Sequence, residues 1–99
     1  MRAIGETLTL YPVVAAGEAV AYGEYIEIQA VVNPARVDEV LLEPGYVLND
    51  YVAIYAFAPI RRRDKVRWRG VDYEVLTVQP FSWKGETAYF KAVCRRLLG

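Results

Sequence analysis

Short stretches of alternating apolar and polar residues run along the chain, separated by turn residues. Residues 25–32 show this pattern most clearly, because every even-numbered position is apolar and Glu27 and Gln29 lie between them. A period of two puts the apolar side chains on one face of a strand and defines its register. We therefore expect a strand over residues 25–32 that ends at Asn33-Pro34.

The second half of the chain predicts three consecutive strands. Residues 65–78 form the clearest unit: apolar and basic positions alternate up to Trp68, Gly70 supplies a turn, and the chain returns as a second strand. A turn around Gly85 then leads into a last strand over residues 87–95. Together these segments predict a C-terminal antiparallel meander.

The middle of the chain is less regular. Residues 50–57 are apolar on both faces from Tyr51 onward, which is typical of a central strand or of a strand at an interface. Residues 36–43 alternate poorly and predict a strand or a long loop. A short helix over residues 34–42 is an alternative, because three aliphatic residues in this segment have helical spacing.

Composition supports an all-β fold. Proline and glycine punctuate the chain often, and its eight tyrosines suit the half-buried surface of a pleated sheet. With 99 residues and 55% hydrophobic content, the chain is long enough to bury one core. We expect a single domain over residues 1–99, a small β-barrel or sandwich.

The net charge of the chain is zero, but its charges are unevenly distributed. Residues 1–50 contain two basic and eight acidic residues, a net charge of −6, whereas residues 51–99 contain ten basic and four acidic residues, a net charge of +6. Such halves attract copies of the chain head to tail, as in a ring. Alternatively, the two halves interleave in the fold and neutralise each other locally.

Few side chains suit catalysis. The chain has no His, and its one Cys, Cys94, is in phase with Phe90 and Ala92, as expected of a small buried hydrophobic residue. A lone Cys excludes an internal disulfide and fits a reducing cytoplasm. No calcium-loop spacing or phosphate-binding Gly-rich motif is present. We expect no enzyme activity, no cofactor and no metal site.

Membrane insertion is not expected. The longest uncharged run in the second half, residues 51–60, has about half the length of a membrane-spanning helix.

A basic cluster is the main candidate interaction site. Asp64 is the one acidic residue within it, and Trp68 and Trp83 lie nearby in the sequence. The basic residues of the cluster are Arg61, Arg62, Arg63, Lys65, Arg67 and Arg69. Three interpretations remain open: a contact with another protein, a solvated loop, or a surface for nucleic acid. In strand register Trp68 faces away from Arg67 and Arg69, so we expect it in the core. Tyr51 and Tyr55, on the doubly apolar strand, are further candidates for an interface.

The segment from Asp64 to Val75 resembles the late hairpin of small neck proteins of tailed bacteriophages, the head-closure or head-tail stopper and joining family. In that family an acidic residue starts a strand, a Gly turns it, and a Tyr two positions before an aliphatic residue opens the return strand, as Tyr73 and Val75 do here. The last strand ends in basic residues, here Arg95-Arg96. Members often carry Gly before the acidic residue, where this chain has Arg63.

This resemblance implies a structural virion protein, made in the host cytoplasm and located in the virion neck. Such a protein forms a ring, usually of six copies, that joins the portal and its adaptor to the tail and retains packaged DNA without sequence-specific binding. The ring is a homo-oligomer on the particle, and a free monomer is compatible with it. In such rings the long middle segment faces the channel or the next subunit, which places Asp38, Glu39 and Glu43 there.

Two other functions remain open from the sequence. One is a different ring protein of the same tube, a tail-tube or tail-completion component. The other is a nucleic-acid-binding barrel of the OB type that uses the basic cluster.

Overall fold

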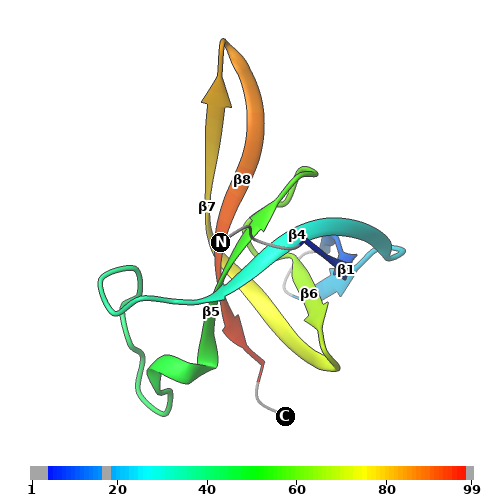
Figure 1. Ribbon diagram of the computed structural model, residues 1–99. Coiled ribbons are helices and arrows are strands. Elements are labelled where there is room, and N and C mark those ends of the chain that lie inside the picture. The colour runs from blue at the N-terminus through cyan, green and yellow to red at the C-terminus, as the bar shows by residue number, and fades with distance from the viewer. Residues whose placement is uncertain (1–4, 17–18, 98–99) are drawn as a thin grey trace.

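The computed structural model describes residues 5–16 and 19–97. Six strands close into an antiparallel barrel in the order β1-β4-β5-β8-β7-β6, and β2 and β3 form a separate two-stranded sheet (Figure 1). The strands and one short 3₁₀ helix are β1 (Glu6–Tyr11), β2 (Val13–Ala16), β3 (Ala19–Tyr22), β4 (Ile26–Pro34), η1 (Leu48–Asp50), β5 (Tyr51–Ala56), β6 (Lys65–Trp68), β7 (Val71–Trp83) and β8 (Glu86–Arg96). The expected all-β fold is confirmed, and it is a barrel.

The barrel interior holds the apolar side chains that the alternation places inward. In β4, Ile28 and Ala30 are buried whereas Glu27 and Gln29 are exposed, which confirms the predicted register. This strand continues through Pro34, beyond the end expected from the sequence. Cys94 is fully buried among the core side chains, and burial raises the pKa of its thiol.

Two tight hairpin turns confirm the predicted meander. Arg69-Gly70 and Lys84-Gly85 each place both residues at positive φ, at 51° and 77° and at 52° and 83°. This is the geometry of a type I′ turn, whose twist matches that of paired strands. The turn around Gly85 is tighter than the sequence suggests, because pairing continues out to Trp83 and Glu86.

The hairpin of β7 and β8 is longer than the barrel requires. Only residues 71–74 of β7 pair with β6, and only residues 90–95 of β8 pair with β5. Residues 81–89, here called the β7–β8 arm, are therefore paired only with each other and project from the barrel (Figure 1).

The prediction of a short helix over residues 34–42 is wrong. Residues 35–47 form an irregular loop with turns, and the described residues contain no helix other than η1. Ala35 N donates to Tyr51 O at 3.4 Å, and Glu43 N donates to the Tyr51 hydroxyl at 3.3 Å, so the loop runs along the outside of β5. A helix there would need a buried apolar face, yet Leu41 is 87% exposed.

β5 is a central strand, between β4 and β8. Val52, Ile54 and Ala56 face the core, whereas Tyr51 and Ala53 face outward and are also buried. The loop of residues 35–47 supplies contacts to Tyr51, which explains why this strand is apolar on both faces. No helix in the described part of the chain is long and apolar enough to cross a membrane.

Candidate protein-docking surface

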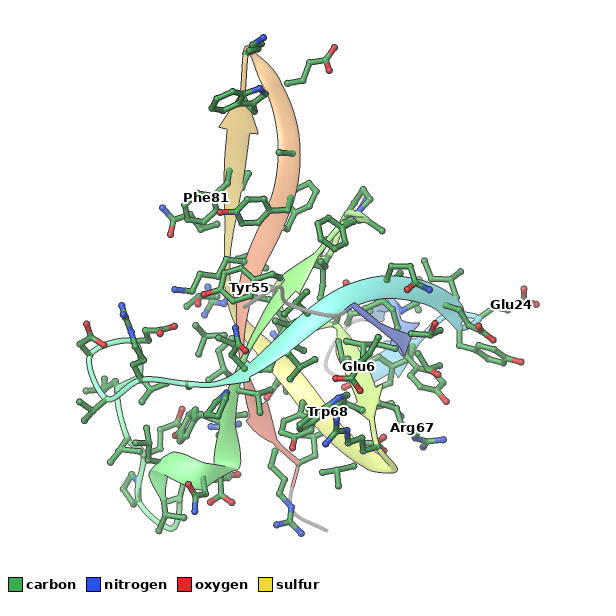
Figure 2. The ribbon with its side chains drawn as sticks, viewed as in Figure 1. Glu6, Glu24, Tyr55, Arg67, Trp68 and Phe81 are labelled. Carbon is green, nitrogen blue, oxygen red and sulfur yellow. The ribbon has the colours of Figure 1, made fainter. Side chains whose placement is uncertain are left out.

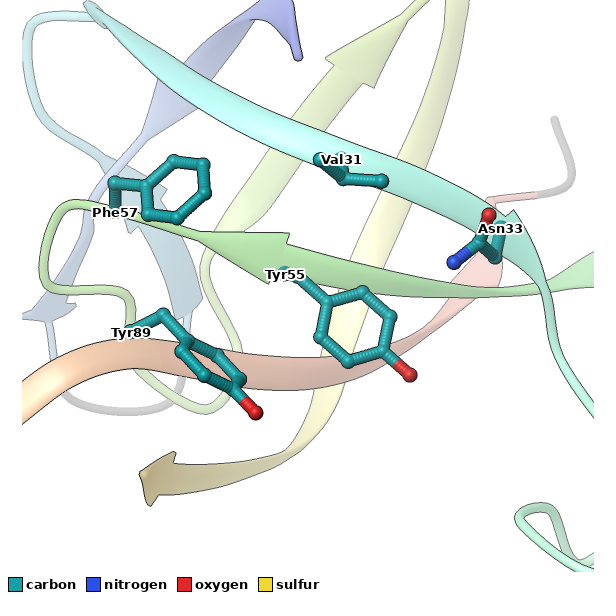
Figure 3. A pocket seen from close by; sticks show the side chains of 5 residues that line it. All are labelled: Val31, Asn33, Tyr55, Phe57 and Tyr89. Carbon is teal, nitrogen blue, oxygen red and sulfur yellow. The ribbon is translucent and has the colours of Figure 1, made fainter. Parts of the chain in front are cut away.

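An apolar depression lies on the outer side of the barrel, at the base of the β7–β8 arm. It has a volume of about 290 Å³ and is lined by Val31, Asn33, Tyr55, Phe57 and Tyr89 (Figure 3). These side chains come from β4, from β5 and the residue after it, and from β8. Alternation along β5 turns Tyr55 outward, because its neighbours Ile54 and Ala56 fill the core.

The aromatic rings continue from this depression onto the arm. Phe81 stacks on its cross-strand partner Tyr89, with ring centroids 4.9 Å apart and an interplanar angle of 10°. Tyr89 in turn lies 6.0 Å from Tyr55, in a tilted arrangement. We call Tyr55, Phe57, Phe81 and Tyr89 the aromatic face; Figure 2 shows Tyr55 and Phe81 along it. Contacts between neighbouring rings hold this face in one conformation before any partner binds.

Part of this surface is open to solvent. Phe57 is 58% exposed, and Trp83, farther out on the arm, is 71% exposed. Large aromatic side chains are enriched in the buried centres of protein interfaces, and contiguous exposed apolar surface is typical of docking sites. The arrangement is therefore suited to bind another protein.

A charged pair borders the aromatic face. Lys91 Nζ lies 3.0 Å from Glu39 Oε2 and 5.7 Å from the centroid of the Tyr55 ring. The hydrogen bond from Lys91 lowers the pKa of Glu39, and the same bond raises the pKa of Lys91. This pair attaches the loop of residues 35–47 to β8.

The predicted channel carboxylates do not form one free acidic patch. Glu39 binds Lys91, and Glu43 binds Arg95, whose Nη2 also lies 3.1 Å from Glu74 Oε1. Asp38 is exposed and lies 3.5 Å from Arg36 Nε. Two of the three predicted residues therefore attach the loop to its own barrel.

The acidic and basic halves of the sequence interleave in the fold. Barrel closure puts β1 beside β6, where Glu6 accepts hydrogen bonds from Trp68 Nε1 at 3.2 Å and Arg69 Nε at 3.3 Å. Glu39 and Glu43 meet basic residues of β8 in the same way. Local neutralisation, one of the two alternatives left open by the sequence, is thus present among the described residues.

The basic cluster is divided between two structural environments. Arg67 Nε donates to Asp72 Oδ1 at 2.8 Å and holds the pKa of that carboxyl below its usual value. Arg69 binds Glu6 and lies over the Trp68 ring, 4.8 Å from its centroid. Trp68 itself packs against the core as expected, but it is only half-buried, and Arg69, which was expected on the opposite face, covers its ring. Arg67 and Arg69 are therefore engaged within the chain.

Arg61, Arg62 and Arg63 remain exposed in the turn before β6. The next residue, Asp64, is 2% exposed and accepts backbone hydrogen bonds from Val13 N and Arg61 N, both at 2.8 Å. Sequence reasoning missed this role of Asp64, which looked like a mere interruption of the cluster. The family pattern, in which an acidic residue starts the strand, was a signal that could have indicated this role of Asp64.

The two tyrosines predicted at an interface have different roles. Tyr51 is 1% exposed and holds the loop in place, whereas Tyr55 belongs to the aromatic face. Phe57, Phe81, Tyr89 and Trp83 were not predicted as surface residues. Strand alternation puts Tyr89 on the face opposite to buried Ala92, so the sequence could have predicted that Tyr89 points outward. It could not have predicted the rings that contact Tyr89, because these come from other strands.

The described residues contain no group of three or more side chains suited to hold a metal ion. No known protein-family model matches the sequence, and a search of curated proteins finds no significant match.

Proposed function

We propose that this protein is a structural joining protein that assembles into a ring in the neck of a tailed phage. In this role it connects the portal and its adaptor to the tail and helps to retain packaged DNA. It is made in the host cytoplasm and acts in the virion, without catalysis. The observation that carries the proposal is the aromatic face, which continues onto an arm that extends beyond the barrel.

Three properties support a joining role. The closed barrel is a rigid base, because each of its strands is hydrogen-bonded to a neighbouring strand on both sides. Trp83 is exposed and is the last residue of β7, which extends away from that base (Figure 1), so a neighbouring protein can reach it. The segment from Asp64 to Val75 resembles the late hairpin of head-closure proteins. A tail-tube or tail-completion ring would use the same surfaces and is the nearest alternative.

A binding assay on phage heads tests this function. We would incubate the purified protein with DNA-filled, tailless heads of a candidate host and measure bound copies per head and DNA leakage. Binding at one vertex with reduced leakage is expected. Phe57→Ser and Trp83→Ser should each weaken binding about tenfold or more, because both remove large apolar side chains from the docking surface.

Val47→Ser provides the matched control, since Val47 is 62% exposed but lies outside the aromatic face. It should bind heads like the unmodified protein. Absence of head binding by the unmodified protein would reject the neck role. Equal binding by Phe57→Ser and Val47→Ser would reject the aromatic face as the docking surface, and equal binding by Trp83→Ser and Val47→Ser would exclude the end of the arm.

A further inference from the structure

The turn formed by Arg61, Arg62 and Arg63 carries charge that the fold leaves uncompensated. All three residues are exposed, and within the described part of the chain none of them makes an ion pair. By contrast, Arg67, Arg69, Lys91 and Arg95 each bind a carboxylate. Lys65, the remaining member of the basic cluster, is half-buried, and its Nζ lies 4.4 Å from the centroid of the Tyr11 ring. The turn is therefore the exposed part of the cluster that is free to bind an anionic partner.

The turn is held in one backbone conformation. Arg63 N donates to Val75 O at 2.7 Å, Val75 N donates to Asp64 O at 2.9 Å, and Asp64 N donates to Arg61 O at 3.1 Å. The buried Asp64 carboxylate adds its bonds to Val13 N and Arg61 N. Since the backbone is already ordered, a partner binds the arginines with a smaller loss of conformational entropy.

Arg63 has a strained backbone. Its φ is +78°, a region that glycine adopts freely and that longer residues avoid. Arg69 and Lys84 also have positive φ, but each is the first residue of a two-residue hairpin turn. Arg63 is followed by Asp64 in an irregular turn, where glycine would relieve the strain. Strain of this kind is concentrated at functional positions, which points to a role for the guanidinium.

The surroundings of the turn favour a polypeptide over a nucleic acid. Arg62 and Arg63 line a groove of about 520 Å³ together with Leu41 and Leu76. The groove also contains Glu43 and Glu74, whose carboxylates are both paired with Arg95. Aliphatic walls next to free guanidinium groups fit a segment that presents both carboxylates and apolar side chains.

The chain has such a segment at the start of β4. Glu24, Tyr25, Ile26 and Glu27 are all exposed, with Tyr25 at 61% and Ile26 at 48%. Neither carboxylate of this segment makes an ion pair with another described residue. We call residues 24–27 the acidic corner. It lies at the same end of the barrel as residues 61–63, because Ile26 at the start of β4 and Val66 near the start of β6 both pair with Leu10 of β1.

We propose that the arginine turn, residues 61–63, of one copy binds the acidic corner of the next copy. This inference rests on the proposed ring function and names its lateral contact. Because the two surfaces are different and share no residue, the contact is heterologous, the type that builds a ring when the rotation closes. The guanidinium groups of the turn pair with the carboxylates of Glu24 and Glu27, and the groove receives the side chains of Tyr25 and Ile26.

Disulfide trapping tests this contact in the full chain, both with concentrated free protein and with protein bound to tailless heads. The native Cys94 is fully buried and gives little background. A chain with Arg61→Cys and Glu24→Cys should form a ladder of linked oligomers about tenfold faster than a control with Arg61→Cys and Arg96→Cys. Equal rates for the two pairs would overturn the proposal.

Charge reversal adds specificity to the test. In the chain with Arg61→Cys and Glu24→Cys, the further change Glu27→Arg should slow disulfide trapping about tenfold. Adding Arg62→Glu to that variant should restore the trapping rate, because the charge pair is then present in reversed form. Arg63→Gly should raise the unfolding midpoint because strain is relieved, yet slow trapping because a guanidinium is lost. If trapping is unaffected by Arg63→Gly, the residue has no part in the contact and the proposal fails.

The outcomes separate this contact from the broader function. Control-level trapping together with normal head binding would reject the contact and leave the joining role intact. Control-level trapping together with loss of head binding on Phe57→Ser would leave only the aromatic face as an interface. If Arg62→Glu instead abolishes a steeply salt-dependent affinity for short DNA, the turn is a nucleic-acid site and the proposal is wrong.

Discussion

At the scale of single residues, Asp64 shows how the fold changes the meaning of a charge. In the sequence it is an acidic residue among arginines, which is typical of a solvated turn. In the structure it is 2% exposed, and its two carboxylate oxygens accept hydrogen bonds from Val13 N and Arg61 N. Asp64 thereby connects the turn before β6 to the beginning of β2, 51 residues away in the sequence.

Replacing Asp64 should be strongly destabilising. Asp64→Ala leaves two backbone N–H groups without their acceptors, and we expect the free energy of unfolding to fall by about 3 kcal/mol. Asp64→Asn should cost less, because the amide oxygen still accepts one bond. Urea unfolding measures both values. Asp72→Ala is the control: this residue pairs with exposed Arg67, so a loss below about 1 kcal/mol is expected. Similar losses for Asp64→Ala and Asp72→Ala would contradict the structural role of Asp64.

At the scale of elements, the loop of residues 35–47 is held by side chains and not by regular backbone pairing. Glu39 binds Lys91, Glu43 binds Arg95, and Tyr51 connects the loop to β5. The β7–β8 arm is the opposite case, because its backbone is paired within the hairpin, apart from a register shift between Phe81 and Ser82, but few other elements support it. The attachment of the loop to the barrel should therefore depend on pH, whereas the stability of the arm should depend on the turn at Lys84 and Gly85.

Acid should release the loop. The ordinary pKa of Glu39 is 4.5, and the bond from Lys91 lowers it in the folded protein. A depressed pKa means that the stabilisation is fully present above about pH 4.5 and is lost as the pH falls through the lower folded value. Hydrogen exchange or limited proteolysis of residues 35–47 at pH 6 and pH 3 would show this change.

Lys91→Met separates this effect from other acidic groups. The pKa of Asp72 is also lowered, by Arg67, so the total stability of the protein falls in acid for more than one reason. In Lys91→Met the loop should be less protected already at neutral pH, because one of its attachments is lost while Glu43–Arg95 and Tyr51 remain, and its protection should change less between pH 6 and pH 3. A loop that stays protected in this variant would rule out the Glu39–Lys91 pair as its attachment.

At the scale of the whole molecule, internal pairing of charges argues against general binding of polyanions. The net charge is zero, and carboxylates from the first half of the chain bind Arg69, Lys91 and Arg95 of the second half. We therefore expect only weak affinity for short single-stranded or duplex DNA at physiological salt. In a fluorescence titration, the logarithm of affinity should change little with the logarithm of salt concentration, since few phosphates are contacted. A steep fall with salt would instead support the OB-type barrel.

Much of the fold follows from local patterns. The period of two in residues 25–32, and the glycines at positions 70 and 85, predict strands and turns that the structure contains. These predictions succeed because strand alternation and left-handed turn geometry depend on residues close together in the chain. The failed helix over residues 34–42 shows the limit, because loop contacts with Tyr51 and β8 outweigh helical spacing in a short segment.

The sequence by itself determined an all-β barrel or sandwich, the meander, the buried Cys94 and the zero net charge, because composition and short-range periodicity are sufficient for these features. Only the tertiary structure decided that the sheet closes, that Asp64 is buried, and which arginines remain free. It also brought Val31, Phe57 and Tyr89 together at one depression. These features depend on strand order and on contacts between distant segments, which local patterns do not specify.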